Sequence, residues 1–589
     1  MKVIIAKTAG FCMGVRRVVD MAVDMTSKSS KPVYSIGPLI HNNQTLEMLR
    51  QRGIRMLDED NPAPEGSTAL IRAHGVPPAI QKHLEKKYHL IDGTCPKVKT
   101  VHKVIRKYRN RGFSIIITGD KGHAEVTGLL GYAGDAGYLI QTVDDIRLLP
   151  DFKKVCLVSQ TTFNRNDFDE ITQKIRERFS PAEIVVKKTI CAATDRRQTE
   201  TRELASAVDA MVVVGGKNSA NTLRLAKISQ ESGTPTQHIE TEQEIDWEQL
   251  SHCNTVGITA GASTPGWMIR RVADHIHFLD RSTRKTVTSN IARFFEILAN
   301  MNFFVAAGGI AMYYASSIFQ ELPFHWIGAA LASLYLLSIY LWNSLASIEK
   351  NKHLDISRYR FYNANKTRLT ILAVTCIMIL LSISFLHSPP LFYLLLVPTA
   401  AGCFYQFTIV PKALRRVIRY SNLKDIPTSR DLFAALAWAA LITGIPQAIN
   451  GVFIVTTPTI SIFLWTFLLA YIRSLIFDLR DIEGDRIMGR ETLITIIGEK
   501  KVRRLIFYAL MASFAILCCF FVLTFFPCRI SNAPAYTFLL QLPVLLHIGI
   551  FMKWQHKLKN HLSALFNILA EGQFYIAGLG AWIVALVSG

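Results

Sequence analysis

The sequence is poor in cysteine, and its first residues contain no long apolar run. Ten cysteines are scattered over 589 residues, and none lies within a CxxC distance of Cys12. The start, MKVIIAKTAG, is strand-like, with no apolar core and no cleavage site, so no signal peptide is predicted. We therefore expect the first half of the chain to stay in the reducing cytoplasm, where disulfides are not expected.

Acidic residues are outnumbered by basic ones, 45 to 66, which gives a net charge of +21. The sequence contains no nucleic-acid recognition motif and no dinucleotide fingerprint. The positive charge gathers partly in loops between apolar segments, where it indicates membrane topology and attraction to anionic lipid heads. A nucleic-acid partner is therefore not expected.

Long apolar runs are absent before about residue 299 and frequent after it. Each of nine runs is close to the ~20 residues that cross a bilayer as a helix. They span residues 299–318, 324–343, 369–387, 391–410, 432–449, 452–473, 505–526, 534–552 and 565–587. The loops after the even-numbered runs are basic, and the others are short and nearly uncharged. Because basic loops stay inside, we predict a nine-span protein of a bacterial inner membrane, with its N-terminal half cytoplasmic and its C-terminus outside.

The N-terminal half alternates strand-like and helical segments. Runs such as FSIIITG, KVCLVSQ and AMVVVGG are short, β-branched and apolar on both faces, as in parallel sheets covered by helices. Many end in glycine or a small polar residue before a helix, and ligands gather at such strand ends. The widely spaced Cys12, Cys95 and Cys191 share this setting, so each could come from one of three similar α/β units.

These three cysteines allow several interpretations. Any one of them alone could be an ordinary buried cysteine, which is the interpretation that best fits Cys156 and Cys253. Three converging thiolates would form an incomplete metal site: zinc with an open fourth position, or an iron–sulfur cluster with one uncoordinated iron. The spacing does not decide between the two metals.

Polar side chains follow the same kind of turn. Histidines stand in PLIHNN, RAHGV and GDKGHAEVTG, and GGKNSANTLRL is a flexible turn before a helix. Backbone N–H groups at a helix start suit an anion such as diphosphate. Together these motifs predict an anion pocket over a cysteine-held centre. The polar candidates are His41, His74, His123, Glu125, Gln160, Thr161, Thr162, Asn218, Ser219, Asn221 and Ser263.

Nine motifs occur in order between residue 1 and about residue 280: AGFCMGVRR, GPLIHN, RAHGV, DGTCPKV, GHAEVTG, SQTTF, ICAATDRRQ, VVVGGKNSANTLRL and GITAGASTP. This ordered set resembles the 4-hydroxy-3-methylbut-2-enyl diphosphate reductases, the last enzymes of the methylerythritol phosphate route to isoprenoids. The resemblance implies a three-lobed (trefoil) α/β fold around a 4Fe-4S cluster. Its ligands would be Cys12, Cys95 and Cys191, with the fourth iron open to the substrate's 4-hydroxyl.

The resemblance also implies roles for the polar residues. Glu125 matches the proton donor, and Thr161 matches a hydroxyl beside it. Ala220 stands where the family usually has a second serine, so one hydroxyl contact to diphosphate, worth roughly 1.5–3 kcal/mol, should be missing. The matching contacts to diphosphate are His41, His74, His123, Ser219, Asn221 and Ser263.

The implied reaction removes an allylic hydroxyl as water and yields isopentenyl or dimethylallyl diphosphate. Because no dinucleotide fingerprint is present, we expect electrons to arrive from an external ferredoxin or flavodoxin. A membrane-tethered redox sensor that uses the cluster without turnover is the alternative, although a sensor needs no diphosphate pocket. A transporter is disfavoured, since ionisable residues gather at the cytoplasmic ends of the spans.

The C-terminal half carries one acidic motif, in FDLRDIEGD. On a helix Asp478, Asp481 and Asp485 share a face, and clustered carboxylates at a membrane surface could hold Mg²⁺ and through it a diphosphate. A solvated helix end is the simpler reading, and the neighbouring arginines favour it. With nine spans, residues 295–589 resemble the UbiA-type intramembrane prenyltransferases.

That resemblance is incomplete at a second acidic motif, NDxxDxxxD. Here the segment reads NSLASIEKN, with Ser344, Ser347 and Asn351 in place of aspartates and Glu349 out of register. We therefore keep two hypotheses: an altered prenyltransferase assisted by basic residues such as Lys424, or a non-catalytic scaffold that binds a prenyl lipid. The predicted organisation is a reductase-like domain over 1–283, a linker over 284–298 and a UbiA-like membrane domain over 299–589.

Overall fold

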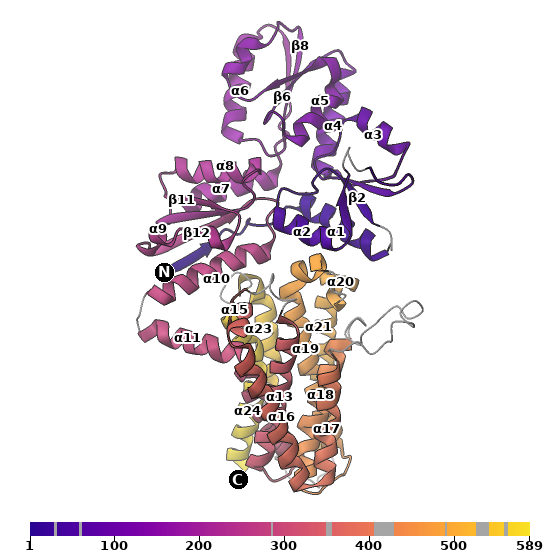
Figure 1. Cartoon of the computed structure of the whole chain (residues 1–589), viewed down its shortest axis with the longest axis vertical. Coiled ribbons are helices and arrows are strands. Elements are labelled where there is room, and N and C mark those ends of the chain that lie inside the picture. The colour runs from indigo at the N-terminus through magenta and orange to yellow at the C-terminus, as the bar shows by residue number, and fades with distance from the viewer. Residues whose placement is uncertain are drawn as a thin grey trace. The chain divides into compact units, whose positions relative to one another are not determined.

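The computed structural model contains two compact units, which are described separately (Figure 1). The first comprises Met1–Asp280 with Arg486–Gly489, and the second comprises Arg281–Asp485 with Arg490–Gly589. The residues that the structure describes are 1–28, 32–57, 62–283, 287–348, 356–405, 429–488, 492–525, 541–558 and 563–588.

The first unit is built on three sheets of four parallel strands each. The first sheet has the order β1 (Lys2–Ile5), β12 (Thr255–Ala260), β10 (Ala210–Val214), β11 (Thr236–Ile239). The second has the order β3 (Ile54–Met56), β2 (Val33–Ile36), β4 (Thr68–Ile71), β5 (His89–Asp92). The third has the order β7 (Gly137–Ile140), β6 (Ser114–Thr118), β8 (Lys154–Ser159), β9 (Glu183–Val186). The expected three-lobed α/β fold is confirmed.

Helices connect and cover these strands. They are α1 (Met13–Lys28), α2 (Asn43–Gln51), α3 (Pro78–Glu85), α4 (Pro96–Arg109), α5 (Ala124–Ala133), α6 (Arg165–Arg178), α7 (Ala192–Ala205), α8 (Ala220–Glu231), α9 (Trp247–Ser251) and α10 (Gly266–Thr283). The central strand β6 is buried on both faces, since Ile115, Ile116 and Ile117 have no exposed surface. Continuous apolar runs such as FSIIITG arise because helices cover both faces of a parallel sheet.

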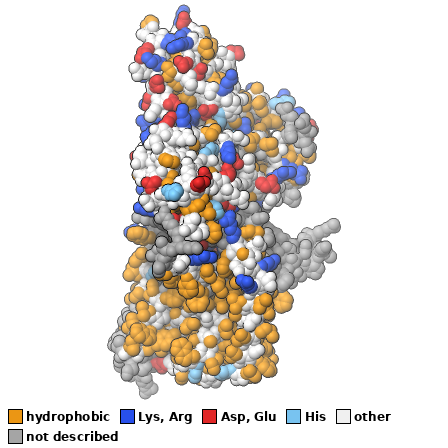
Figure 2. Space-filling view, turned by 60° about the vertical axis from the view of Figure 1, so that its left-hand side comes forward, with side chains coloured by type: hydrophobic (Ala, Val, Ile, Leu, Met, Phe, Trp, Pro, Cys, Tyr) orange, Lys and Arg blue, Asp and Glu red, His pale blue; other side chains and the backbone are white. Residues whose placement is uncertain are grey.

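The second unit is helical. Its helices are α11 (Val287–Asn300), α12 (Phe303–Phe319), α13 (Trp326–Ala346), α15 (Ile356–Ala364), α16 (Lys366–His387), α17 (Pro389–Phe404), α18 (Ser429–Ile449), α19 (Thr457–Met488), α20 (Leu493–Ile497), α21 (Glu499–Phe525), α23 (Leu542–Leu558) and α24 (Ser563–Ser588). Large apolar side chains crowd its outer surface, as expected for a surface that faces lipid (Figure 2).

A helix overlaps each of the nine predicted spans, but the count of nine is not established. Within the described residues, six helices are long and apolar enough to cross a membrane. A bent pair, Arg293–Asn300 and Phe303–Phe319, meets at 71° and would make a seventh. Two overlaps are with shorter apolar helices, Pro389–Phe404 and Leu542–Trp554.

The segment predicted as a linker is largely helical, because α11 begins at Val287. Four of its apolar side chains are exposed: Ile291, Phe294, Phe295 and Ile297. Exposed apolar residues on one face of an amphipathic helix beside spanning helices fit a helix that lies at the membrane interface.

Candidate active site

Each of the three candidate cysteines lies where a strand gives way to a helix. Cys12 directly precedes α1, Cys95 is the N-cap residue of α4, and Cys191 is the N-cap residue of α7. The preceding strands, β1, β5 and β9, belong to the three different sheets. Every cysteine therefore meets the positive end of a helix dipole, which favours thiolates and any anionic group that they hold.

The sulfur atoms share one region of the first unit. A Cβ built on Gly14 would lie 2.7 Å from Cys95 Sγ and 3.9 Å from Cys12 Sγ, so the glycine leaves room beside both. Burial raises the pKa of the Cys95 thiol, and the nearby Cys12 and Cys191 thiolates raise it further. Three neighbouring cysteines, with a glycine that leaves room beside two of their sulfur atoms, form a donor set that fits a metal centre.

Two arginines join the cysteine turns to one another. Arg17, on the helix that follows Cys12, donates from Nη1 to the carbonyl oxygens of Gly93 and Thr94 at 3.2 and 3.3 Å, just before Cys95. Arg197, on the helix that follows Cys191, donates from Nη2 to Thr8 O and Gly10 O at 2.7 and 2.6 Å, just before Cys12. The sequence reasoning did not single out either arginine; both occur in motifs that it quoted, AGFCMGVRR and ICAATDRRQ.

His41, His74 and His123 form a compact group. One ring nitrogen from each lies within 4.8 Å of the others, and the ring centroids are 5.2 to 5.9 Å apart. Burial lowers the pKa of all three, that of His123 to about 4, so the rings are neutral near pH 7. His123 Nδ1 accepts a hydrogen bond from Glu125 N at 3.2 Å, which places the ring proton on Nε2.

Several buried nitrogen atoms, in two of these histidines, in the neighbouring Arg72 and in Asn221 of α8, have no hydrogen-bond partner among the described residues. They are His41 Nε2, His74 Nδ1, Arg72 Nε and Asn221 Nδ2. Buried polar atoms are normally paired, so these positions call for a ligand. Three histidines alone would suit a metal ion, but Arg72 Nε and Asn221 Nδ2 are N–H donors that cannot ligate one. The set therefore favours an anion with several acceptor oxygens, and Arg72 is a candidate contact that the sequence reasoning missed.

The remaining predicted diphosphate contacts come from the first sheet. Ser219 is the N-cap residue of α8, whose first residues are Ala220 and Asn221. Ser263 Oγ donates to His41 O at 3.1 Å, which joins the end of β12 to the histidine group. Because Ala220 opens the helix, its backbone N–H remains at the helix start even though its side chain has no hydroxyl.

Glu125 is the most buried acid of the site, with 1% of its surface exposed. Its Oε1 accepts from Thr161 N at 2.7 Å, and its Oε2 accepts from Thr161 Oγ1 at 2.9 Å. Burial raises the pKa of Glu125 to about 7, although the two Thr161 hydrogen bonds act in the opposite direction. A carboxyl group with a pKa near neutrality can donate a proton at physiological pH.

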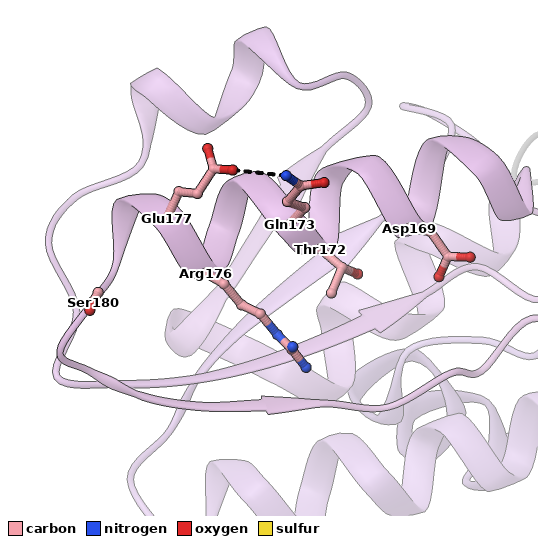
Figure 3. Close-up of a pocket in the computed structure, with 6 residues that line it drawn as sticks. All are labelled: Asp169, Thr172, Gln173, Arg176, Glu177 and Ser180. Carbon is pink, nitrogen blue, oxygen red and sulfur yellow. Dashed lines mark hydrogen bonds between the residues drawn. The ribbon is translucent and has the colours of Figure 1, made fainter.

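A surface hollow on α6 lies elsewhere and carries none of the predicted site residues (Figure 3). It is lined by Asp169, Thr172, Gln173, Arg176, Glu177 and Ser180. Gln173 Nε2 donates to Glu177 Oε1 at 3.1 Å, one helical turn away. Polar residues that pair along one turn are typical of a solvated helix face.

In the second unit, the acidic motif lies on α19 and its members differ in environment. Asp478 and Asp485 are buried, whereas Asp481 is 33% exposed by its side chain and is held by Arg480 at 2.9 and 3.0 Å. Asp478 forms an ion pair with Arg430, a residue that the sequence reasoning did not consider. The other named positions, Glu349, Asn351 and Lys424, lie outside the described residues.

Comparisons with known proteins divide the chain at the same place as its architecture. A family profile described as "LytB protein" matches residues 3–277, and one described as "UbiA prenyltransferase family" matches residues 301–570. The 4-hydroxy-3-methylbut-2-enyl diphosphate reductase of Clostridioides difficile is 40% identical over 282 residues, which cover 47% of this chain and 100% of that protein. The Aquifex aeolicus enzyme of the same name is 41% identical over 278 residues, which cover 46% of this chain and 95% of that protein.

Solved structures resemble each half. A structure of (E)-4-hydroxy-3-methyl-but-2-enyl diphosphate reductase has 40% sequence identity and a TM-score of 0.38, and covers 47% of this chain and 100% of its own. A UbiA homologue from Archaeoglobus fulgidus bound to DMAPP and Mg²⁺ has 12% identity and a TM-score of 0.34, and covers 49% of this chain and 99% of its own.

Proposed function

Because the N-terminal half of this chain belongs to the LytB family of 4-hydroxy-3-methylbut-2-enyl diphosphate reductases, we propose that it reduces this diphosphate to isopentenyl and dimethylallyl diphosphate. The observation that carries the proposal is the set of unpartnered buried nitrogens next to Glu125, which Thr161 joins to the Cys191 turn. A pocket with these donors suits a diphosphate group next to a redox centre, whereas a sensor without turnover has no use for it.

The proposed reaction breaks the bond between the allylic carbon and its 4-hydroxyl oxygen. It consumes two electrons and two protons: one proton leaves with the oxygen as water, and the other adds to one end of the allyl unit. The end that is protonated decides between isopentenyl and dimethylallyl diphosphate. The electrons would come from an external ferredoxin or flavodoxin.

The anion pocket binds and orients the substrate in this proposal. His123 presents its Nε2 proton, because Nδ1 is already an acceptor, while Asn221 Nδ2 and Arg72 Nε supply further donors. Neutral imidazoles hold the diphosphate by hydrogen bonds, and they are already positioned before it arrives. Fixed donors in a water-poor pocket stabilise negative charge more effectively than water does.

Glu125 holds the proton for the leaving oxygen. In its protonated form, the carboxyl group can donate to Thr161 Oγ1, which lies 2.9 Å away, and the Thr161 hydroxyl can pass a proton onward. The Thr161 backbone N–H fixes the other carboxyl oxygen, so the group keeps its orientation.

The cysteine group fits a 4Fe-4S cluster. Cys12, Cys95 and Cys191 would hold it, with Gly14 leaving the space beside two of the sulfurs. When bound, such a cluster supplies electrons one at a time. Arg17 and Arg197 keep the cysteine turns in position through their hydrogen bonds to backbone carbonyl groups.

Arg197→Gln is expected to make the reduction potential of the cluster more negative while iron content is retained. Arg197 is 5% exposed; burial lowers its pKa, and the Cys12 and Cys191 thiolates act in the opposite direction, so its positive charge lies close to the redox centre. Loss of that charge makes an added electron less favourable. An EPR-monitored redox titration measures the effect, with the exposed Arg196→Gln on the same helix as the control. An unchanged or more positive potential would contradict the expectation.

The proposed activity is tested on the full-length protein, purified anaerobically with its iron and sulfide content measured. With a strong reductant and the diphosphate substrate, we expect both C5 diphosphates by mass spectrometry, and none when the reductant is omitted. Cluster-loaded protein that reacts reversibly with the reductant but forms no product would overturn the reductase proposal in favour of a redox sensor.

The C-terminal half is a membrane-embedded UbiA-like domain, and for it we propose binding of a prenyl diphosphate from the cytoplasmic side. The basic loops after the even-numbered spans support a cytoplasmic N-terminal half and an outer C-terminus. The buried acids of α19 support a polar site at one end of the helices. Cysteine-accessibility labelling of intact cells at the two chain ends tests this topology.

A further inference from the structure

Helices α13 and α19 of the second unit run in the same direction. At one end of this unit, Gln447 Nε2 donates to Gln320 Oε1 at 2.9 Å and to Thr459 Oγ1 at 3.1 Å. His325 is the N-cap residue of α13, and its Nε2 lies 3.1 Å from Oδ1 of Asn450, which follows α18. Both α13 and α19 therefore begin at this end, and their last turns lie at the opposite end.

A hydrogen bond in the second half of both helices shows that equivalent turns of α13 and α19 lie side by side. Arg473 Nη1 of α19 donates to the hydroxyl of Tyr340 on α13 at 3.0 Å. Ser344 follows Tyr340 by four residues and Asp478 follows Arg473 by five, so at 1.5 Å per residue both lie roughly 6 to 8 Å further towards the same end. Two polar clusters thus form at one end of the helix bundle, one around Ser344 and one around Asp478.

The cluster around Ser344 is organised by a guanidinium group. Arg358 Nη2 donates to Asn302 Oδ1 at 2.8 Å and to Ser344 Oγ at 2.9 Å. Asn302 Nδ2 also donates to the Tyr362 hydroxyl at 3.0 Å. Asn302 has a left-handed backbone, with φ of 60°, at the 71° bend between α11 and α12. A non-glycine residue in this conformation, held by three side chains, is typical of a functional position.

Among the described residues, this cluster lacks the ligands of a divalent cation. Residues 326–348, which comprise α13 and the two described residues after it, contain no aspartate or glutamate. Ser344 Oγ donates to Tyr340 O at 2.7 Å, and Ser347 Oγ donates to Asn343 O, so backbone carbonyl groups engage both hydroxyls. Mg²⁺ is normally held by carboxylates, and Asn302, Ser344, Arg358 and Tyr362 supply none.

The cluster around Asp478 does retain a place for one cation. Asp478 is 3% exposed; its Oδ1 accepts from Arg430, and its Oδ2 has no partner among the described residues. Arg430 Nε also donates to Asp431 Oδ1 at 3.2 Å, so one arginine bridges two buried carboxylates. A buried carboxylate oxygen without a partner calls for a positive or donor group.

We propose that the C-terminal domain binds the diphosphate of a prenyl diphosphate with Arg358 in the place of one metal ion, and with a single divalent cation on the Asp478 side. A guanidinium group is always charged and presents paired N–H donors that match phosphate oxygens. The Arg358 guanidinium group therefore supplies the positive charge that a metal ion would supply if the aspartates of the second acidic motif were present. This inference rests on the proposed prenyl diphosphate binding of the membrane half and is independent of the reductase activity.

Binding of geranyl diphosphate to the cluster-loaded full-length protein in lipid nanodiscs tests the proposal. Arg358→Gln is expected to weaken binding about 10- to 100-fold, the usual effect of losing a charge-assisted contact, and Arg358→Lys should recover part of it. The matched control is Arg360→Gln on the same helix. Magnesium titration should follow a single-site curve with a Hill coefficient near one, and Asp478→Asn should remove the magnesium effect.

Several outcomes would overturn the proposal. They are a sigmoidal magnesium curve that requires two ions, an Arg358→Gln protein of unchanged melting temperature and unchanged affinity, or no binding by the unaltered chain. If Arg358→Gln does not fold, Arg358→Lys decides instead, since full affinity and a two-ion curve in that variant would be equally contrary. Reductase turnover of the same samples reports separately on the N-terminal half, so failure of one proposal does not imply failure of the other.

Discussion

Cys95→Ser in the full-length protein is expected to abolish the four-iron signal and to lower reductive turnover by more than about 100-fold, since even loss of a partner behind a metal ligand costs 10- to 100-fold. Cys95 is the N-cap residue of α4, its sulfur lies beside Gly14, and the N–H groups of Lys97 and Val98 point to it. A serine hydroxyl in this position is a much poorer ligand for iron than a thiolate.

The measurement is iron and sulfide content together with the EPR spectrum of the reduced, anaerobically purified protein. Cys253→Ser is the matched control. Cys253 precedes strand β12, whereas Ala262, whose carbonyl oxygen accepts from Cys12 N, follows that strand. The Cys253 Sγ donates to Gln249 O at 3.7 Å. A cluster signal that persists unchanged in Cys95→Ser would remove the ligand assignment for all three cysteines.

Glu125→Gln is expected to lower turnover by roughly 100- to 10,000-fold, the usual range for loss of a general acid, while cluster content stays unchanged. Glutamine keeps the shape of the side chain and can still accept from Thr161 N, but it has no acidic proton. Substrate affinity should change little, because the side-chain amide leaves the histidine group untouched. Steady-state kinetics with a strong reductant separate the loss in kcat from any change in KM.

The pH dependence gives the same residue a second readout. Burial raises the pKa of Glu125 to about 7, so the fraction of protonated acid falls as pH rises through that value. We expect turnover of the unaltered protein to fall between pH 6 and pH 8, and the residual turnover of Glu125→Gln to be flat over that range. The exposed Glu170→Gln on α6 is the control. Full activity in Glu125→Gln, or an unchanged pH profile, would contradict the assignment.

Much of the first unit could be anticipated because its chemistry lies at the ends of strands. Cys12, Cys95 and Cys191 each stand at a strand-to-helix turn, and such turns are recognisable from a short apolar run followed by glycine or a small polar residue. The three-sheet fold follows from runs such as FSIIITG, which are apolar on both faces. The residue roles in the site stay predictions that the experiments above address.

The second unit was less predictable. Hydropathy located a helix at every expected run, but it does not measure whether a run forms one straight helix. Helices α11 and α12 meet at an angle of 71° near Asn302, which has a left-handed backbone, so run 299–318 does not begin as one straight helix. Within the part of the chain that the structure describes, runs 391–410 and 534–552 overlap apolar helices shorter than a full span.

Composition and local pattern were enough to separate a parallel α/β half from an apolar helical half. They also marked the turns that carry cysteine and histidine. Both succeed because hydrophobic periodicity, charge and turn chemistry depend on a few neighbouring residues. Folding in three dimensions was needed to bring Arg197 to the Cys12 turn, Thr161 to Glu125, Arg358 to Ser344 and Arg430 to Asp478. These partners are remote in the chain or lie on different elements. Their meeting depends on how whole sheets and helices pack, which no short stretch of sequence encodes.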